Sequence, residues 1–318
     1  MKKQLHIWMS AVAATILAAA AACSHKEIIC GGEGMRRVEI AFDWQRAPAA
    51  DPAGMTLFFF PEEPGSKIWR YEIAGREGGD VELTPSIFSI VAFNNDLPGV
   101  RIADATSYGS LAAYAQPIST ASAEEIAPTG ILYTALSDRF AVSLCGDSRL
   151  HLSPDTINIE YVVIARRCRG LEGVRSVRGR LLGPAEGVRI ADGESVGRRC
   201  AVTFAMTAED EGADGVSLRG RTTGFEPRRV SGQSPGGDTA PLLTLTLRAT
   251  LKDGTAVEKS FDVSDQANRG AHHRVYIIKE GIEFPASGQP PGPGEDVGDI
   301  EVDVEGWSVI ETIINSDS

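Results

Sequence analysis

Hydrophobic and polar residues alternate along much of the chain, and a period of two is typical of half-buried β-strands. Near the start, the apolar residues Val38, Ile40, Phe42 and Trp44 are separated by single charged or small residues. The next apolar run, residues 55–60 (MTLFFF), has almost no polar position, which predicts a central strand buried on both faces. Turn residues end each run, so the pattern of the first third predicts an antiparallel β-sandwich.

The second half of the chain has the same character. Residues 156–165 (TINIEYVVIA) predict a strand with Ile157, Ile159 and Tyr161 on one face. Alternating residues in 243–251, an Asp-Gly turn and a returning run at 257–263 predict a β-hairpin.

Two segments depart from the strand pattern. Apolar residues spaced one turn apart, Leu171, Val174 and Leu182, predict a short amphipathic helix over residues 171–182. Residues 106–129 are rich in Ala, Ser and Pro and predict a long connection, with one helical turn at 110–115.

Composition agrees with an all-β protein. The 318 residues include 34 glycines and 17 prolines, as expected for a chain with many turns, and 42% hydrophobic residues are enough for sizeable cores. The net charge of −12 argues against nucleic acid as a partner, because its phosphates attract basic surfaces. No small-molecule cofactor is expected either, since no phosphate-cradling glycine loop or paired-carboxylate motif stands out.

The first residues have the features of a bacterial export signal. Lys2 and Lys3 precede an apolar run that is shorter than the ~20 residues needed to cross a bilayer. Small residues then lead into Cys23, in a pattern that resembles a bacterial lipobox, where the cysteine thiol receives a diacylglycerol. We therefore expect residues 1–22 to be a signal peptide and Cys23 to hold the protein in the outer membrane, with the rest of the chain at the cell surface. The alternative is an ordinary cleavable signal followed by a chance cysteine.

The remaining chain divides into a short tether and two predicted domains. Residues 23–35 are polar and glycine-rich and read as a tether. Residues 36–148 predict an N-terminal sandwich and 149–318 a C-terminal one, because a new strand pattern begins soon after 145–148 (CGDS). Besides Cys23, the chain has four cysteines: Cys30, Cys145, Cys168 and Cys200. They are either buried small residues or form one or two disulfides, and the sequence does not distinguish among the three possible ways of pairing all four.

The sequence contains no convincing catalytic or metal site, so we expect no enzyme activity. Two G-x-S-x-G patterns occur, which in α/β-hydrolases surround the nucleophilic serine. In the first, residues 232–236, the residue after the serine is Pro235, which has no backbone N–H to donate to an oxyanion. The other, around Ser195, lies between two predicted strands instead of between a strand and a helix. The adjacent His272 and His273 should point to opposite faces of a strand. The acidic run 295–305 is an alternative calcium site, but alternating acids are more typical of a solvated strand edge.

Several segments, taken in order, resemble the fimbrillin-like lipoproteins of Bacteroides-type anaerobes. The segments in the second half include LKDGTAVEKSFDVSDQ, RVYIIKEGIEFP and VDVEGWSVI; those in the first half are VEIAFDW, GMTLFFFP and FSIVAFNND. The resemblance implies two tandem transthyretin-like β-sandwich domains tethered by lipid, acting as structural, anchoring or adhesive parts of fimbriae with other fimbrial subunits as partners. It also implies assembly by β-strand addition, in some subunits after proteolysis beyond a basic residue, for which Arg37 and Arg46 are the candidates here.

The sequence is also compatible with a second function. A stand-alone surface lipoprotein would bind glycan or host protein through loops at one end of a sandwich. That function requires an aromatic platform built from Trp69 and Tyr71, or from Trp44. An open apolar groove beside a displaceable strand would instead favour the fimbrial role.

Overall fold

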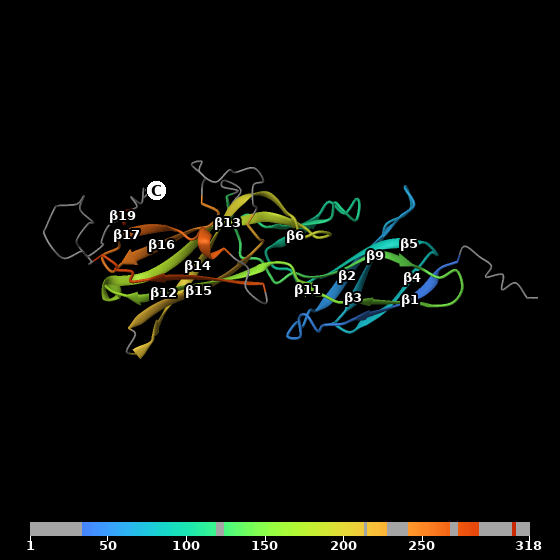
Figure 1. The fold of residues 1–318 in the computed structure, drawn as a ribbon, viewed down its shortest axis with the longest axis horizontal. Helices are drawn as coiled ribbons and strands as arrows, with labels where there is room; N and C mark the ends of the chain where they lie inside the picture. The colour runs from blue at the N-terminus through green and yellow to red at the C-terminus, as the bar shows by residue number, and fades with distance from the viewer. Residues whose placement is uncertain are drawn as a thin grey trace, which may run out of the picture.

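The computed structural model describes residues 34–118, 124–212, 215–227, 241–267, 273–285 and 307–309. Within these ranges the chain is almost entirely β-structure, and its helical residues are confined to short 3₁₀ turns such as η1 (Leu171–Gly173) and η3 (Ser264–Gln266). The predicted all-β fold is therefore confirmed (Figure 1).

The first half forms two facing sheets. The smaller sheet has the order β10-β1-β4 and the larger the order β11-β9-β5-β2-β3. The bounds are β1 (Arg36–Phe42), β2 (Gly54–Pro61), β3 (Trp69–Ala74), β4 (Gly78–Leu83), β5 (Ile87–Asn94), β9 (Tyr133–Ala141), β10 (Ser148–Leu152) and β11 (Asp155–Thr156). Between the sheets, Val38 and Ile40 of β1 pack in one core with Leu57 and Phe59 of β2.

β1 is the central strand of the smaller sheet. It pairs in parallel with β10, Val38 opposite Ser148, and antiparallel with β4, Val38 opposite Val81. The Val38 side chain is 0% exposed. The first strand thus supplies a central part of the core.

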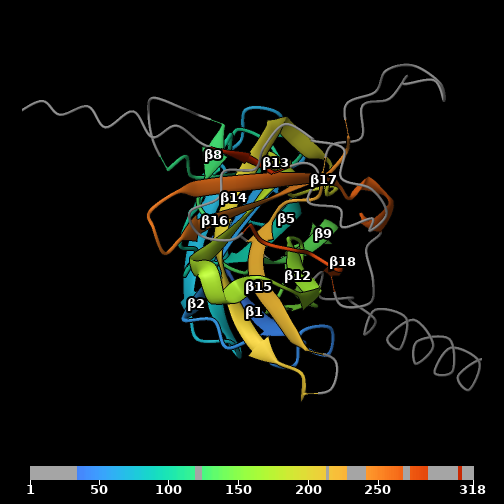
Figure 2. The same ribbon diagram turned by 90° about the vertical axis from the view of Figure 1, so that its left-hand side faces the viewer.

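The second half is built on one large sheet that bends over a single core. Its main path is β18-β12-β15-β14-β13-β16-β17-β19. The bounds are β12 (Ile159–Cys168), β13 (Val174–Arg189), β14 (Ser195–Asp210), β15 (Val216–Gly224), β16 (Thr244–Leu251), β17 (Ala256–Asp262), β18 (Arg274–Glu280) and β19 (Ser308–Val309). Because β14 pairs with β13 along one stretch and with β15 along another, the sheet folds so that β16 and β17 lie across from β12 and β15 (Figure 2). Tyr161 and Leu245 both belong to the core between these layers.

The predicted helix over residues 171–182 is wrong. Only the turn Leu171–Gly173 is helical, and β13 begins at Val174. Within β13, Val177, Gly179 and Leu181 are buried while Arg178 is exposed, which is a period of two. The hydrophobicity pattern missed it because Gly179 stands at a core position: a Cβ there would lie 2.5 Å from the ring of Phe204.

The predicted helical turn at 110–115 is also wrong. β7 (Ala112–Ala115) is a strand that pairs with β6 (Val100–Ala103) and with β13. The short β8 (Glu125–Ile126) pairs in parallel with β14. These three strands precede β9 in sequence but belong to the sheet of the second half.

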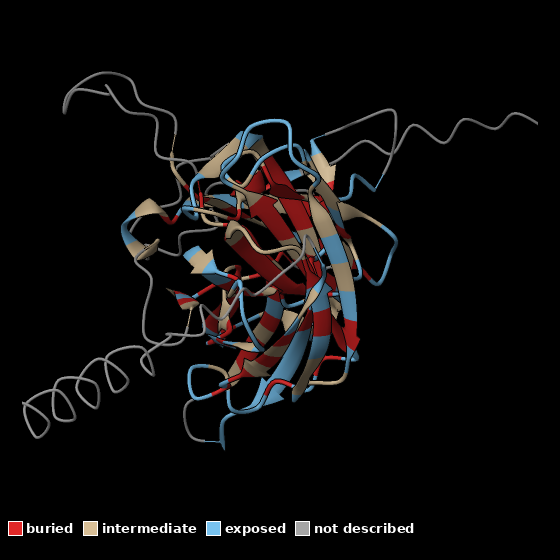
Figure 3. Cartoon of the chain, turned by 90° about the vertical axis from the view of Figure 1, so that its right-hand side faces the viewer, coloured by how far each residue is buried: buried red, intermediate tan, exposed pale blue. Residues whose placement is uncertain are grey.

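A third core lies where the two halves meet. Phe60, Val91 and Phe93, from the larger first-half sheet, share this cluster with Leu111 and Val188. Buried residues, red in Figure 3, accordingly run through both halves of the molecule. This second contact explains why residues 55–60 are apolar on both faces: Leu57 and Phe59 face one core and Phe60 the other.

In the structure, the chain passes from the first half to the second half at a later residue than the predicted boundary between residues 148 and 149. A division between residues 148 and 149 falls inside β10, which pairs with β1. After the earlier excursion of β6, β7 and β8 into the second-half sheet, the chain leaves the first-half sheets for the last time after β11 and continues in the second-half sheet from β12. The division into two domains as such stays a prediction.

Candidate functional site

The two candidate processing residues lie in different settings. Arg37 is inside β1, opposite Glu82 of β4, and its guanidinium lies 2.7 Å from the carboxylate of Asp80. The hydrogen bond to Arg37 holds the pKa of Asp80 below its usual value. Arg46 lies in the turn after β1, and its side chain is 67% exposed. A cut after Arg37 would leave Val38 and the rest of β1 in the ladder, whereas a cut after Arg46 would separate the whole strand.

The described cysteines differ in oxidation state. Cys145, in the loop between β9 and β10, is disulfide-bonded. Cys168 and Cys200 are buried and carry free thiols, and burial raises the pKa of the Cys168 thiol to about 11. Neither can therefore be the partner of Cys145. The other two cysteines, Cys23 and Cys30, lie outside the described residues.

The residues considered for catalysis or metal binding have structural roles where they are described. Ser195 opens β14 directly after the turn from β13, and its hydroxyl donates to the Glu226 carbonyl at 2.7 Å. The predicted strand–turn–strand context is therefore confirmed. His273 lies 3.5 Å from Asp155. The pattern 232–236, His272 and the acidic run 295–305 lie outside the described residues.

Two kinds of feature are absent from the described ranges. No cluster of three or more His, Cys, Asp and Glu side chains there is arranged to hold a metal ion. In the same part of the chain, no helix has the length and apolar character needed to cross a membrane.

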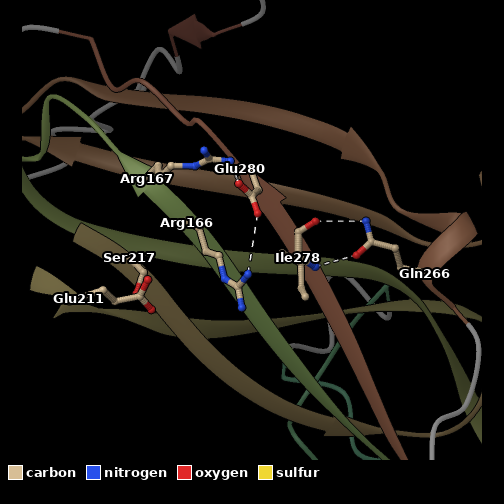
Figure 4. Close-up of polar contacts among 7 residues, drawn as sticks. All are labelled: Arg166, Arg167, Glu211, Ser217, Gln266, Ile278 and Glu280. Atoms are coloured by element: carbon tan, nitrogen blue, oxygen red, sulfur yellow. Dashed lines mark hydrogen bonds and ion pairs between the residues drawn. The ribbon is translucent and has the colours of Figure 1, made fainter. Parts of the chain in front are cut away.

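One open sheet edge is capped by a side chain. β18 pairs in parallel with β12 on one side. On its other side the Gln266 amide bonds both backbone groups of Ile278, accepting from the N–H at 2.6 Å and donating to the carbonyl at 3.2 Å (Figure 4). Arg166 and Arg167 pair with Glu280 at the end of the strand. Gln266 thus occupies the position that a residue of an added strand would take.

Of the aromatic residues predicted to form a platform, Trp44 is buried, whereas Trp69 and Tyr71 lie together on an edge strand. Trp44 is only 7% exposed, and its indole N–H donates to the Arg76 carbonyl at 2.7 Å. Trp69 and Tyr71 lie on edge strand β3, both half-buried, with their rings 6.4 Å apart and only 10° from parallel. Trp69 and Tyr71 therefore form an aromatic pair, to which Trp44 does not contribute.

Trp69 of this pair lines an open pocket at one end of the first-half sandwich. Trp69 and Phe88 line it, with the loops β2–β3, β4–β5 and β9–β10 around them, and its volume is about 690 Å³. The Arg36 guanidinium donates to the Leu144 carbonyl at 3.1 Å, so β1 begins beside the same pocket. Sequence reasoning named the two aromatic residues, but the loop residues come from distant segments and gave no local signal.

The chain resembles known proteins in its sequence and in its fold. Over 93 residues the chain is 28% identical to "Putative fimbrium anchoring subunit Fim4B" of Bacteroides ovatus, a match that covers 29% of this chain and 27% of that protein. The chain thus spans about a quarter of the length of this curated relative. The local match supports the resemblance to fimbrillin-like proteins seen in the sequence.

Solved structures share the fold. A "putative adhesin" from Bacteroides ovatus aligns with a TM-score of 0.62 and 19% identity over 84% of this chain and 98% of that one. A Bacteroides thetaiotaomicron structure described as "putative polysaccharide binding proteins (DUF1812)" aligns with a TM-score of 0.50 and 11% identity, covering 78% of this chain and 91% of that chain. At these identities the likeness concerns the fold alone, and it supports the β-sandwich prediction.

The family assignment comes from the sequence profile that matches residues 22–205, more than half of the chain and all of the first-half sheets. The match continues through β12 and β13 and ends within β14. The chain belongs to the family described as Domain of unknown function (DUF5119).

Proposed function

We propose that this protein is a lipid-anchored structural or adhesive component of cell-surface fimbriae, held in the outer membrane through Cys23. The local likeness to a protein named as a fimbrium anchoring subunit supports the fimbrial role. The lysines, apolar run and small residues before Cys23 support the anchor.

The disulfide of Cys145 is the observation that favours an anchoring role over a polymerising one. Cys168 and Cys200 are free, and Cys23 is committed to lipid in this proposal, so Cys30 is the partner we assign to Cys145. A cut after Arg46 would then leave the fragment with β1 covalently attached to the β9–β10 loop. Loss of β1 would need both proteolysis and reduction, which suits a subunit that keeps its first strand.

The lipid anchor predicts a defined mature protein. Intact mass spectrometry of whole outer membranes should find an acylated chain that begins at Cys23, and Cys23→Ser should move the protein out of the membrane fraction. Cys200→Ser is the matched control, because it removes a buried free thiol and should leave the location unchanged. A chain that starts after Arg37 or Arg46 in sheared fibres would contradict the anchoring role and indicate a polymerising subunit.

Peptide mapping without reduction tests the disulfide separately. We expect one cross-linked peptide pair that joins Cys30 to Cys145 and disappears on reduction, whereas Cys168 and Cys200 should be recovered as free thiols after denaturation in alkylating reagent. A peptide that joins Cys23 to Cys145 would contradict lipidation at Cys23, because one sulfur atom cannot form both bonds.

The alternative role as a stand-alone surface lipoprotein is favoured by one observation, the aromatic pair beside the pocket. Its loops lie at one end of a sandwich, where β-sandwich proteins commonly bind ligands. The mass measurement on sheared fibres and membranes separates this role from a fibre subunit.

A further inference from the structure

The pocket beside Trp69 has the size and lining of a small-ligand site. Its volume of about 690 Å³ falls within the roughly 300–1,000 Å³ typical of such sites. Apolar side chains, Trp69, Phe88 and Leu144, share the lining with the hydroxyl groups of Thr84 and Ser86. The pocket thus offers a flat ring and several hydrogen-bonding groups at short range.

The aromatic pair is held in place by the core. The Tyr71 ring meets Phe59 edge-on at 6.0 Å, and its hydroxyl donates to the Glu82 carbonyl of β4. Trp69 stacks on Tyr71, so its ring plane is fixed from below. A ligand would meet a ring that is already oriented, which reduces the entropy lost on binding.

Charged groups at the rim complete the site. The Lys67 ammonium lies 3.7 Å from the Trp69 ring centre and covers the ring face that is turned away from Tyr71, so a ligand on this face must displace the lysine. Glu63, which accepts from the Ser66 hydroxyl at 3.3 Å, places a carboxylate on the same rim. With one positive and one negative group, the rim selects for hydroxyl-bearing ligands more than for strongly anionic ones.

The same contacts argue against the addition of a β-strand at this place. The Glu82 carbonyl on β4 is already bonded by Tyr71. On β3, Arg70 and Glu72 form an exposed ion pair along the edge, as is common for strands protected from pairing. An extended peptide would have to break these contacts, whereas a compact ring would not.

We propose that this pocket binds a sugar residue, one C–H face of which stacks on Trp69 in place of the Lys67 ammonium, while its hydroxyls bond to the Ser66, Thr84 and Ser86 side chains, Glu63 and the displaced Lys67. The negative face of an aromatic ring attracts the weakly positive C–H groups of a sugar, and the hydroxyls at its edge need polar partners. The inference does not depend on the fimbrial role; it deepens the alternative role as a surface lipoprotein that binds glycan, and assigns that binding to a specific site.

The position of the pocket defines two sources of sugar. Because β1 begins beside Leu144 and Cys30 is the partner assigned to Cys145, a lipid on Cys23 would hold this end within the reach of residues 24–30, about 25 Å when fully extended. The cell's own outer-leaflet saccharide is then one source, and glycans from the surroundings are the other. Only this choice of source depends on the proposed anchor.

Calorimetric titration of the full-length protein in detergent tests the site. The probes are the saccharide released by mild acid from the producing cells' own lipopolysaccharide and the O-glycans released from gastric mucin. We expect at least one probe to bind. Binding of the lipopolysaccharide saccharide would identify the cell's own surface as the source, and binding of the mucin glycans would identify the surroundings. Failure of both to bind would overturn the inference and leave the membrane location, measured separately, untouched.

Variants then assign the binding to this pocket. Trp69→Ala should weaken binding at least tenfold, Trp69→Phe should retain part of it, and Ser86→Arg should fill the pocket from a loop while the core remains intact. The control is Tyr276→Ala, which removes an aromatic side chain that is 50% exposed on β18. Wild-type affinity in both Trp69→Ala and Ser86→Arg would overturn the proposed site.

Discussion

Phe59→Ala is expected to destabilise the first half of the protein by about 3–5 kcal/mol, the usual cost of removing a buried phenylalanine. The Phe59 side chain is fully buried in β2 between the two first-half sheets. Its ring meets Tyr71 and Phe88 edge-on, each at 6.0 Å. Alanine would leave a cavity lined by both rings, which surrounding strands fixed by their ladders cannot close.

Urea unfolding followed by circular dichroism measures this effect as a lower midpoint. Leu136→Ala is the matched control, because this leucine lies on β9 of the same sheet but is 40% exposed. We expect its midpoint to change little, since exposed substitutions usually fall within about 0.5 kcal/mol. Equal shifts in the two variants would mean that Phe59 does not lie in a packed core.

Asn158→Ala is expected to destabilise the junction between the halves by about 3–5 kcal/mol, because it leaves several buried groups without a partner. The Asn158 side chain is 2% exposed, between β11 and β12. It accepts from the Leu132 N–H at 3.1 Å and donates to the Thr129 hydroxyl and the Gly130 carbonyl at 3.0 and 2.8 Å. One amide therefore fixes the segment 129–132 against the point where the chain changes sheets.

Limited proteolysis gives a local readout for this variant. We expect faster cleavage in 127–132 together with a lower urea midpoint. Asn95→Ala, at an exposed position after β5, is the control and should cleave at the wild-type rate. Unchanged cleavage in Asn158→Ala would show that the third core alone holds the halves together.

The sequence predicts the fold class well because hydrophobic alternation is a local property of each strand. The two-faced run at 55–60 indicates a strand buried on both sides, and it packs on two cores as expected. The pattern fails at β13, where Gly179 occupies a core position without being hydrophobic, and at β7, where alanines carry little period-two contrast. Both strands are stabilised by partners distant in sequence.

The candidate site shows the same limit. Trp69 and Tyr71 are recognisable because a strand carries two aromatic residues on one face. Ser86 and Leu144 join them only through the packing of three loops, and Gln266 reaches Ile278 only through the fold. The oxidation state of Cys145 likewise depends on which residues the fold brings near it.

The parallel pairing of β1 with β10 determines how the molecule would respond to a pulling force. β1 enters at one end, and β10 runs beside it toward β11 and the second half. Once the proposed Cys30–Cys145 disulfide is reduced, tension applied at the start of β1 and resisted by the second half would slide the two strands in opposite directions; while it is intact, the load passes from Cys30 to Cys145 and bypasses β1. The pairs from Val38–Ser148 to Phe42–Leu152 would then be loaded together in shear, instead of opening one after another as in peeling. Because forced unfolding depends on the unfolding rate, this shear geometry would be a second resistance to fluid drag after the disulfide, even where equilibrium stability is modest.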